Sequence, residues 1–248
     1  MDRAIYIAMG AANAALDRQA VTTNNLANTS TAGFRAQLMA MRAVPVNGPS
    51  INTRTLAVES TPWNDDTVGS INLTGRSLDV ALPQNGWLTV LLPDGREAYT
   101  RDGNIEVDSG GQLQVRGYPL VGDGGPIEVP PQSQLTIAPD GTITSLGAGD
   151  EPSAISQIGQ LKMVNAKGQD LRNGDDGLFY PVSTNTGDRL PADRELKLIP
   201  GALESSNVSP VKSMVEMIDT ARGFDMHMKV ISAVDENEKN ANQLLGTS

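Results

Sequence analysis

The chain has 248 residues, with 19 Lys and Arg against 29 Asp and Glu for a formal net charge of −10, one His and no Cys. This acidic balance, without a polybasic segment, argues against nucleic acid and anionic membrane surfaces as partners, because both attract clustered cations. The missing Cys and the single His227 exclude disulfides, thiol nucleophiles and zinc sites that need thiolates or two His ligands, and the length fits one or two domains.

Charge and composition separate the two ends of the chain from its middle. Residues 1–60 carry a net charge of +2 and residues 210–248 carry −2, whereas residues 61–209 carry −10. The middle also holds 20 of the 25 Gly and 12 of the 15 Pro, while the ends hold eight of the nine Met. Gly and Pro punctuate strands and turns, and Met favours helices. The composition therefore predicts helical ends around a middle of short strands.

The first expected element is an N-terminal helix of about 30 residues. Its narrow apolar stripe consists of Ile5, Met9, Ala12, Leu16 and Leu26, with Gln19 and Thr23 in the gap. A narrow, partly polar seam suits a partner helix better than a globular core. The run 4–12 after Arg3 resembles a secretory signal, but Asp2 cancels the charge of Arg3 and the stripe continues past the cleavage point. No segment has the apolar length that a transmembrane helix needs.

The middle of the chain begins with a segment of low periodicity. Residues 45–66 are rich in Pro, Asn, Ser and Thr, which is typical of a linker or extended arm. After it, short alternating or apolar runs predict strands at 77–82, 87–92, 104–107, 112–115, 135–138, 142–146 and 161–165. Four Asp-Gly pairs, which are typical of hairpin turns, begin at Asp94, Asp102, Asp140 and Asp176.

The C-terminal helix is expected to begin at Pro210, with Asn207 or Ser209 as its cap. Its seam follows steps of three and four residues through Met214, Met217, Ala221, Phe224, Met228 and Ile231. Gly223 lies inside the helix and costs about 1 kcal/mol relative to Ala, so either a partner packs closely there or the helix alone is marginal. Because each terminal helix has one narrow seam, we expect the two to pair, either as a simple hairpin or as a hairpin that also packs against further copies.

The expected fold class is therefore α+β, with long terminal helices paired like a coiled coil and a central all-β domain. The sequence predicts four segments: an N-terminal assembly helix over 1–35, an extended linker or arm over 36–69, the β domain over 70–205 and a C-terminal assembly helix over 206–248.

Adjacent carboxylates are the raw material of a glycosidase or a calcium site, and here they are Asp65-Asp66, Asp150-Glu151 and Asp175-Asp176. They lie in turn-like sequence, where Asp is favoured for its local hydrogen bonds. The segment 122–126 superficially resembles a phosphate loop but lacks a Lys, so a hairpin is expected there. His227 lies off the main seam, beside no orienting partner. We therefore expect no enzyme, no catalytic residue, no cofactor and no metal site.

One specific motif runs from Asn24 to Arg35: Asn-Asn-Leu-Ala-Asn is followed by Thr and then by Gly33-Phe34. It resembles the signature of the bacterial flagellar rod, hook and hook-associated axial proteins. Residues 77–88 and 201–208 are similar to that family's first β strands and to the element before its C-terminal helix. Gly223 and Asp225 depart from the family pattern, which leaves the packing around them open.

The resemblance implies a structural subunit of the flagellar basal-body rod, part of the drive shaft that transmits torque for motility. The opening Met1–Tyr6, the variant 83–87 and the modest length look like the proximal-rod branch, with distal-rod and hook subunits as the alternatives. The implied partners are copies of the chain, neighbouring rod proteins and the flagellar type III export apparatus, with no nucleic acid and no membrane insertion. The implied location is the periplasm-spanning rod, reached without a cleaved signal peptide.

The resemblance and the seams together predict an assembly interface that consists of Ile5, Met9, Leu16, Asn24, Asn25, Leu26, Asn28, Gly33, Phe34, Met214, Met217, Ala221, Phe224, Met228 and Ile231. Two alternatives belong to other classes of protein. One is a carbohydrate-binding or carbohydrate-cleaving β domain on a helical stalk, and the other is a calcium-stabilised adhesin.

Overall fold

The computed structural model describes residues 2–45, 55–83, 85–149, 151–174, 176–182 and 189–245. The chain forms two compact units. The helical unit comprises residues 1–27, 37–63 and 209–248, and the β unit comprises residues 28–36 and 64–208. The chain therefore passes between the two units four times.

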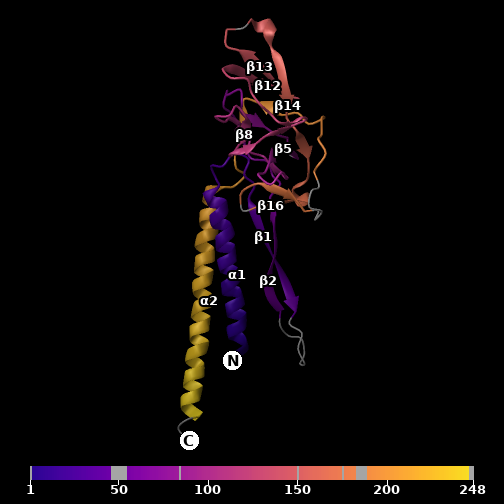
Figure 1. Ribbon diagram of the computed structural model, residues 1–248. Coiled ribbons are helices and arrows are strands. Elements are labelled where there is room, and N and C mark those ends of the chain that lie inside the picture. Colours follow the sequence, from indigo (N-terminus) through magenta and orange to yellow (C-terminus); the bar gives the residue numbers. More distant parts are fainter. Residues whose placement is uncertain are drawn as a thin grey trace. The chain divides into compact units, whose positions relative to one another are not determined.

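The helical unit contains α1 (Asp2–Ala27), α2 (Pro210–Leu245) and a two-stranded sheet of β1 (Gln37–Pro45) and β2 (Thr55–Asn64). The two helices lie side by side and antiparallel, so that α1 begins at the end of the pair where α2 finishes (Figure 1). A second side of α1 packs against β1. With 26 and 36 residues, the helices are about 39 Å and about 54 Å long, so α2 extends beyond α1.

The β unit is built from short antiparallel strands. They are β3 (Ile71–Leu73), β4 (Val80–Ala81), β5 (Gly86–Leu91), β6 (Glu97–Thr100), β7 (Glu106–Val107), β8 (Leu113–Val115), β9 (Tyr118–Pro119), β10 (Val121–Gly122), β11 (Gly125–Pro126), β12 (Ser133–Ile137), β13 (Thr142–Gly147), β14 (Ser156–Gln160), β15 (Met163–Asn165), β16 (Leu171–Asn173), β17 (Phe179–Pro181), β18 (Ile199–Pro200) and β19 (Ala202–Glu204). Two short 3₁₀ helices, Pro152–Ala154 and Gly168–Asp170, complete the unit.

The central sheet of the β unit has the order β15-β5-β6-β17-β16, and it is accompanied by the sheets β12-β13-β14 and β7-β8-β9. The pairs β10-β11, β18-β4 and β19-β3 add two-stranded sheets. Two apolar clusters fill the interior, a large one around Leu88 and Ile143 and a smaller one around Trp87 and Phe179. The Trp87 and Phe179 rings pack with their centroids 4.5 Å apart.

The expected fold class is confirmed, because long terminal helices pair beside a central region of many strands. Each of the seven predicted strand segments contains a strand, but the segment 77–82 forms only the two residues of β4. The reason is a polar turn before it, in which Thr74 Oγ1 and Arg76 Nε donate to the carboxylate of Asp79 at 2.6 and 2.8 Å. Within the predicted linker or arm, the described residues include β1 and β2. The four-segment division itself stays a prediction.

Three of the four Asp-Gly pairs lie in hairpins, between β5 and β6, β12 and β13, and β16 and β17. The pair Asp102-Gly103 does not, and this expectation was wrong. Gly103 is required by close backbone approach instead, since a Cβ there would lie 1.7 Å from the carbonyl oxygen of Val80. The segment 122–126 forms the expected hairpin, with Gly122 opposite Gly125.

Candidate assembly surfaces

One side of α1 carries a regular row of mostly small residues, of which Ala8, Ala12 and Thr22 are buried and the others half-buried. The row consists of Ile5, Ala8, Ala12, Ala15, Gln19, Thr22 and Leu26, in alternating steps of three and four. This spacing of 3.5 residues is that of a coiled coil. Small side chains allow two helix backbones to approach closely. The contacts of Asn25, given below, show that β1 packs against another side of α1. The row therefore faces α2, and we call it the inner row of α1.

The second side of α1 is fixed to β1 through the motif Asn24–Asn28. The amide group of Asn25 donates from Nδ2 to the carbonyl oxygen of Gln37 at 2.9 Å and accepts from the Gln37 N–H at 2.8 Å. This reciprocal pair satisfies both backbone groups at the first residue of β1. Two turns closer to the N-terminus of the helix, Arg18 Nη2 lies 3.8 Å from Met41 Sδ. Asn25 therefore orients β1 against the last turn of α1.

The inner side of α2 also forms a row with steps of four and three. The row consists of Ser213, Met217, Thr220, Phe224, His227, Ile231, Val234, Glu238 and Ala241, of which Ser213 is buried and the others are half-buried. It shares Met217, Phe224 and Ile231 with the predicted seam. The other half of that seam, Met214, Ala221 and Met228, lies on the exposed side of the helix.

On α1, too, the predicted stripe coincides only partly with the inner row. Of the predicted stripe, Ile5, Ala12 and Leu26 lie in the inner row, whereas Met9 and Leu16 are exposed. The physical reason is shared by both helices, since both inner rows include small or polar residues, such as Ala8 and Thr220, that hydrophobic periodicity does not count. The seam predicted from the largest apolar residues is therefore rotated around the helix axis, relative to the inner row, by about the angle between consecutive residues.

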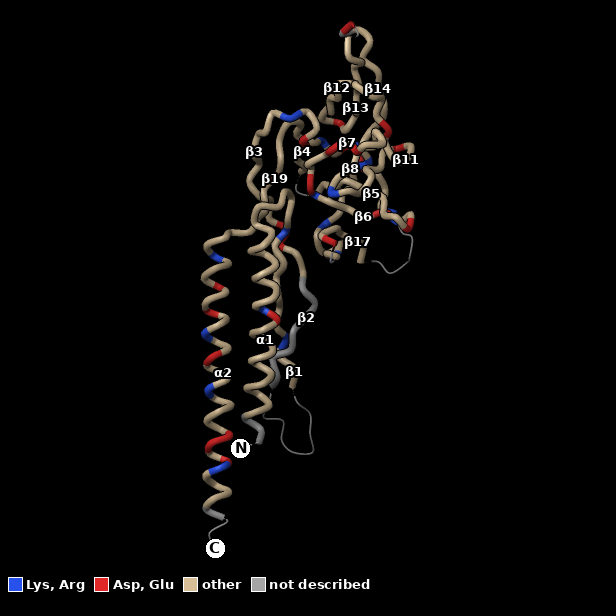
Figure 2. The backbone as a smooth tube through the Cα atoms, turned by 60° about the vertical axis from the view of Figure 1, so that its left-hand side comes forward, with Lys and Arg blue, Asp and Glu red and all other residues tan. Residues whose placement is uncertain are grey.

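Large apolar side chains consequently point outward from both helices. On α1 these are Tyr6, Met9 and Leu16, and on the first turns of α2 they are Val211, Met214, Val215 and Ile218. Tyr6 is 63% exposed, Leu16 52% and Val211 72%. We call these two sets the outward stripes. Between Arg3 and Asp17, α1 carries no charged residue (Figure 2). Most of the residues there are apolar, which is typical of a buried helix.

A second group of predicted interface residues lies in the β unit, just after α1. Thr31 Oγ1 donates to Asn28 Oδ1 at 3.1 Å, and the turn leads into Gly33 and the half-buried Phe34. Gly33 has φ +65°, and a Cβ there would lie 2.3 Å from the carbonyl oxygen of Arg101. Only Gly fits this position. Gly33 is thus part of the internal packing of the β unit.

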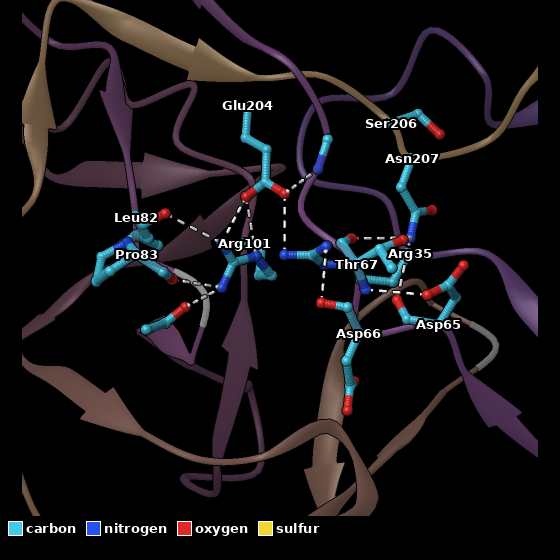
Figure 3. Close-up of polar contacts among 12 residues, drawn as sticks. Arg35, Asp65, Asp66, Thr67, Leu82, Pro83, Arg101, Glu204, Ser206 and Asn207 are labelled. Atoms are coloured by element: carbon cyan, nitrogen blue, oxygen red, sulfur yellow. Dashed lines mark hydrogen bonds and ion pairs between the residues drawn. The ribbon is translucent and has the colours of Figure 1, made fainter.

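Beside Gly33 lies a polar group that we call the junction cluster, which consists of the buried Arg35, Arg101 and Glu204 and the half-buried Asn207 (Figure 3). Arg35 is only 2% exposed, and its Nη2 forms an ion pair with Glu204 Oε1 at 2.9 Å. Arg101 Nη2 and Nε approach the other carboxylate oxygen, Oε2, at 2.5 and 3.0 Å. A single carboxylate therefore bridges two buried guanidinium groups.

The charge balance of the junction cluster affects Arg35. Burial lowers the pKa of Arg35 to about 10, and the neighbouring Arg101 acts in the same direction, while Glu204 opposes both. Arg35 Nη1 also donates to the carbonyl oxygen of Asp66, at 3.4 Å. Buried charges are retained only when they are paired and hydrogen-bonded, so Glu204 holds both cations in place.

Asn207 makes the remaining contacts of the junction cluster. Its Oδ1 accepts from the Ala36 N–H at 2.7 Å, and its Nδ2 donates to the carbonyl oxygens of Asp65 and Thr67, both at 3.0 Å. This side chain is therefore engaged inside the β unit. Of the two expected caps for α2, Ser209 is left, directly before Pro210, and its carbonyl oxygen accepts from the Ser213 N–H at 3.0 Å.

In the sequence, Arg35 and Glu204 stand out only as parts of motifs, Asn207 is expected as a helix cap, and Arg101 carries no signal of a role. One signal of burial was available: Arg35 and Glu204 lie beside apolar residues in segments that resemble family motifs. The partnership between them joins segments too far apart in the sequence for any local pattern, with Arg101 and Glu204 separated by 103 residues.

Two of the adjacent carboxylates, Asp65 and Asp176, act as turn residues. Asp65 Oδ1 accepts from the Thr67 N–H at 2.9 Å, and Asp176 Oδ1 accepts from the Leu178 N–H at 3.0 Å. Tyr180 also donates to Asp176, and burial together with this carboxylate raises the pKa of Tyr180. Asp150 and Asp175 lie outside the described residues. Among the described residues, no group of three His, Asp or Glu is arranged to hold a metal ion.

No described helix combines the length and apolar character that crossing a membrane requires.

Comparisons with known proteins agree with this architecture. Family models match residues 5–35 (Flagella basal body rod protein), 81–145 (Flagellar hook protein FlgE/F/G D1 domain) and 199–244 (Flagellar basal body rod FlgEFG protein C-terminal). These matches cover α1 with its exit, a large part of the β unit and α2 with the strands before it. Fold and matches together define a flagellar axial protein.

Relatives extend the match to the whole chain. The flagellar basal-body rod protein FlgF of Salmonella typhimurium strain LT2 is 54% identical over 251 residues, and that of Escherichia coli K12 is 53% identical over 251 residues, each covering 100% of both chains. FlgG of Buchnera aphidicola subsp. Schizaphis graminum is 32% identical, over 90% of this chain and 92% of the relative. The chain belongs to the flagellar basal-body rod protein family, and it is a structural subunit of that rod.

Proposed function

We propose that this chain is a non-enzymatic subunit of the proximal rod, and that the outward stripes of α1 and α2 are the surfaces through which it assembles with copies of itself and with neighbouring rod proteins. The observation that carries the proposal is the exposure of Tyr6, Leu16, Val211 and Ile218 on helices whose inner rows are already paired. Burying such side chains contributes about 1.5–3 kcal/mol each, which favours their coverage in an assembly.

The proximal assignment is supported by the identities to the relatives. They are 54% and 53% to two FlgF proteins and 32% to a FlgG protein. In this position the subunit would be part of the periplasm-spanning drive shaft, in which paired helices pass torque from one subunit to the next.

Export through the flagellar type III apparatus, without a cleaved signal peptide, is supported by the inner row of α1. The row begins at Ile5 and includes Ala8 and Ala12. Cleavage of the signal-like segment would remove this part of the row and leave the facing part of α2 without a partner.

The proposal is tested by Ile218→Asp, with Ser232→Asp as the matched control on an exposed polar position of the same helix. Cells that carry the variant as their only copy should export the chain but fail to incorporate it into rods and fail to swim. The control should swim normally. Rods containing Ile218→Asp at the normal amount would contradict the proposal.

A second variant, Phe224→Asp, examines the inner row. We expect it to abolish incorporation and motility while leaving the β unit folded, because Phe224 lies between the helices and outside the β unit. The thermal melt of the purified chain, followed through the fluorescence of the buried Trp87 after Trp63→Phe has removed the other Trp, measures the β unit. Normal swimming of this variant would show that the helix pair is not needed for assembly.

A further inference from the structure

The four passages between the units occur after Ala27, Ala36, Trp63 and Val208. Inside the β unit, the stretches next to three of these passages, 33–36, 65–69 and 204–207, converge on the junction cluster (Figure 3). Together with the passage after Ala27, these stretches are the covalent connections through which the helical unit can pull on the β unit.

The three stretches are bonded to one another as well as to the cluster. The Gly33 N–H donates to the backbone oxygen of Glu204 at 2.8 Å, and the Gly69 N–H donates to its Oε1 at 2.9 Å. The Asp65 N–H donates to the oxygen of Ala36 at 2.8 Å. Asn207 adds the contacts to Ala36, Asp65 and Thr67 given above. Each stretch is therefore held by both of the others.

The junction cluster is also attached to the core of the β unit through Arg101. Its Nη1 donates to the oxygens of Pro83 and Gly86 at 3.0 and 2.6 Å, and its Nη2 donates to the oxygen of Leu82 at 3.1 Å. These three residues lie between β4 and β5, or begin β5, which belongs to the central sheet. Glu204 is thus linked to the core by the side chain that pairs with it.

The position of Glu204 relative to the nearest strands matters for mechanics. It is the last residue of β19 and lies opposite Ile71, the first residue of β3. Tension between the passages at Trp63 and Val208 would open this antiparallel pair from that end, one bond at a time. Glu204 occupies the end where such opening has to begin.

We propose that Glu204, Arg35, Arg101 and Asn207 form a mechanical clamp that carries load across the passages and prevents β19 from peeling away from β3. This assigns a positioning role to residues outside the assembly stripes. It rests on the proposed function in one respect, namely that the helices are held by neighbours while the rod turns. The clamp itself is a property of the single chain and can be measured there.

The experiment is single-molecule force spectroscopy on the full-length chain, which contains no native Cys that would interfere with engineered handles. Handles at Trp63→Cys and Ser209→Cys, both exposed, load the passages as the helical unit would. Handles at Pro93→Cys and Ile155→Cys, also exposed, load the β unit elsewhere. In each geometry, the lifetime at constant force is compared between the parent chain and a variant.

The test variant is Glu204→Gln, and the matched control is Glu97→Gln. Glu97 is likewise a buried carboxylate of the β unit, paired with Lys162 at 2.7 Å but remote from the passages in its contacts. We expect Glu204→Gln to shorten the lifetime in the passage geometry by about a hundredfold, because breaking a buried ion pair removes several kcal/mol. Glu97→Gln should leave the lifetime in that geometry almost unchanged.

Equal lifetimes of Glu204→Gln and Glu97→Gln in the passage geometry would overturn the clamp. If Glu204→Gln fails to fold, Arg35→Lys replaces it, since this change keeps the charge but removes the guanidinium contacts to Glu204 and Asp66. Its lifetime should then fall in the passage geometry alone, and an unchanged lifetime would overturn the clamp equally. Because these measurements use isolated chains, they stay valid if Ile218→Asp shows that the outward stripes do not assemble.

Discussion

The two units differ in what they bury. The interior of the β unit contains large apolar side chains with almost no exposure, such as Leu88, Leu113 and Ile143. The inner rows of the helical unit contain Ala8, Ala12 and Ser213, while Tyr6 and Val211 point outward. Apolar burial is the main stabilising term in folding. The β unit therefore has a complete core in the single chain, whereas the helical unit leaves large apolar side chains exposed, as the proposed assembly requires.

The net charge also differs between the middle of the chain and its two ends. The −10 of the whole chain belongs to residues 61–209, and the ends are close to neutral. Helices that pack against many copies would repel one another if each carried a large net charge. The opposite requirement holds for a surface that faces solvent, where a net charge keeps the assembled particle soluble. The near-neutral charge of the ends therefore fits the proposed assembly through the helices.

The largest expected change in stability comes from truncating a core residue of the β unit, in contrast to an exposed residue of α1. Leu88→Ala should lower the free energy of unfolding of the β unit by about 2–5 kcal/mol, because Leu88 is fully buried and a cavity is left. Leu16→Ala should change the stability of the isolated chain by less than about 0.5 kcal/mol, because that side chain is exposed, yet it should reduce incorporation into rods. Urea denaturation and rod composition measure the two effects, and a large stability loss for Leu16→Ala would remove the contrast.

A smaller effect concerns a buried charge in the β unit. Burial raises the pKa of Asp102 above its ordinary value of 3.8, so its charged form is disfavoured in the folded state. The stability that the neutral Asp102 contributes to the folded state is fully present below pH 3.8. It is lost as the pH rises through the raised pKa, because the unfolded state ionises first. Asp102→Asn keeps the acceptor for the Asn104 N–H, which is 3.0 Å from Oδ1.

The Asp102→Asn variant should therefore melt at a higher temperature than the parent chain at pH 7. This advantage should shrink as the pH is lowered towards and below the raised pKa of Asp102. Thermal melts at several pH values provide the measurement. A lower melting temperature for the variant at pH 7 would mean that Arg116, the nearby cation that lowers this pKa, more than compensates the burial.

The smallest effect is expected at Gly223 in α2. A Cβ at this position would meet no other atom within 4 Å in the single chain. Gly223→Ala should therefore stabilise the helix by about 0.5–1 kcal/mol, which circular dichroism of the isolated chain can follow. A loss of helix content would contradict this. If the variant is more helical but absent from rods, a neighbouring backbone must approach Gly223 in the assembly.

The helices and the β class could be predicted from the sequence because their signals are local. Spacing, Pro210 and the Asp-Gly pairs each act within a few residues. The faces of the helices could be predicted only in part, because Met9 and Leu16 form a stronger apolar pattern than the inner-row residues Ala8, which is buried, and Ala15, which is half-buried. Hydrophobic periodicity finds the larger side chains, whereas the inner row of α1 consists mostly of smaller ones.

The junction cluster was beyond sequence reasoning for a different reason. Glu204 and Arg101 would each be expected on the surface, since charged residues are rarely buried unless paired. Their pairing depends on the tertiary arrangement that brings residues 103 positions apart together. Gly33 was recognised as part of a motif, but its close contact with the backbone of Arg101 is visible only in the structure.

The central claim is that the β unit is complete in the single chain and the helical unit is not. Amide hydrogen exchange tests it most directly, measured on the dilute isolated chain and on purified basal bodies. We expect α1 and α2 to exchange rapidly in the isolated chain and slowly in basal bodies, while the strands of the central sheet are protected in both. Equal protection of the helices and the central sheet in the dilute chain would contradict the claim.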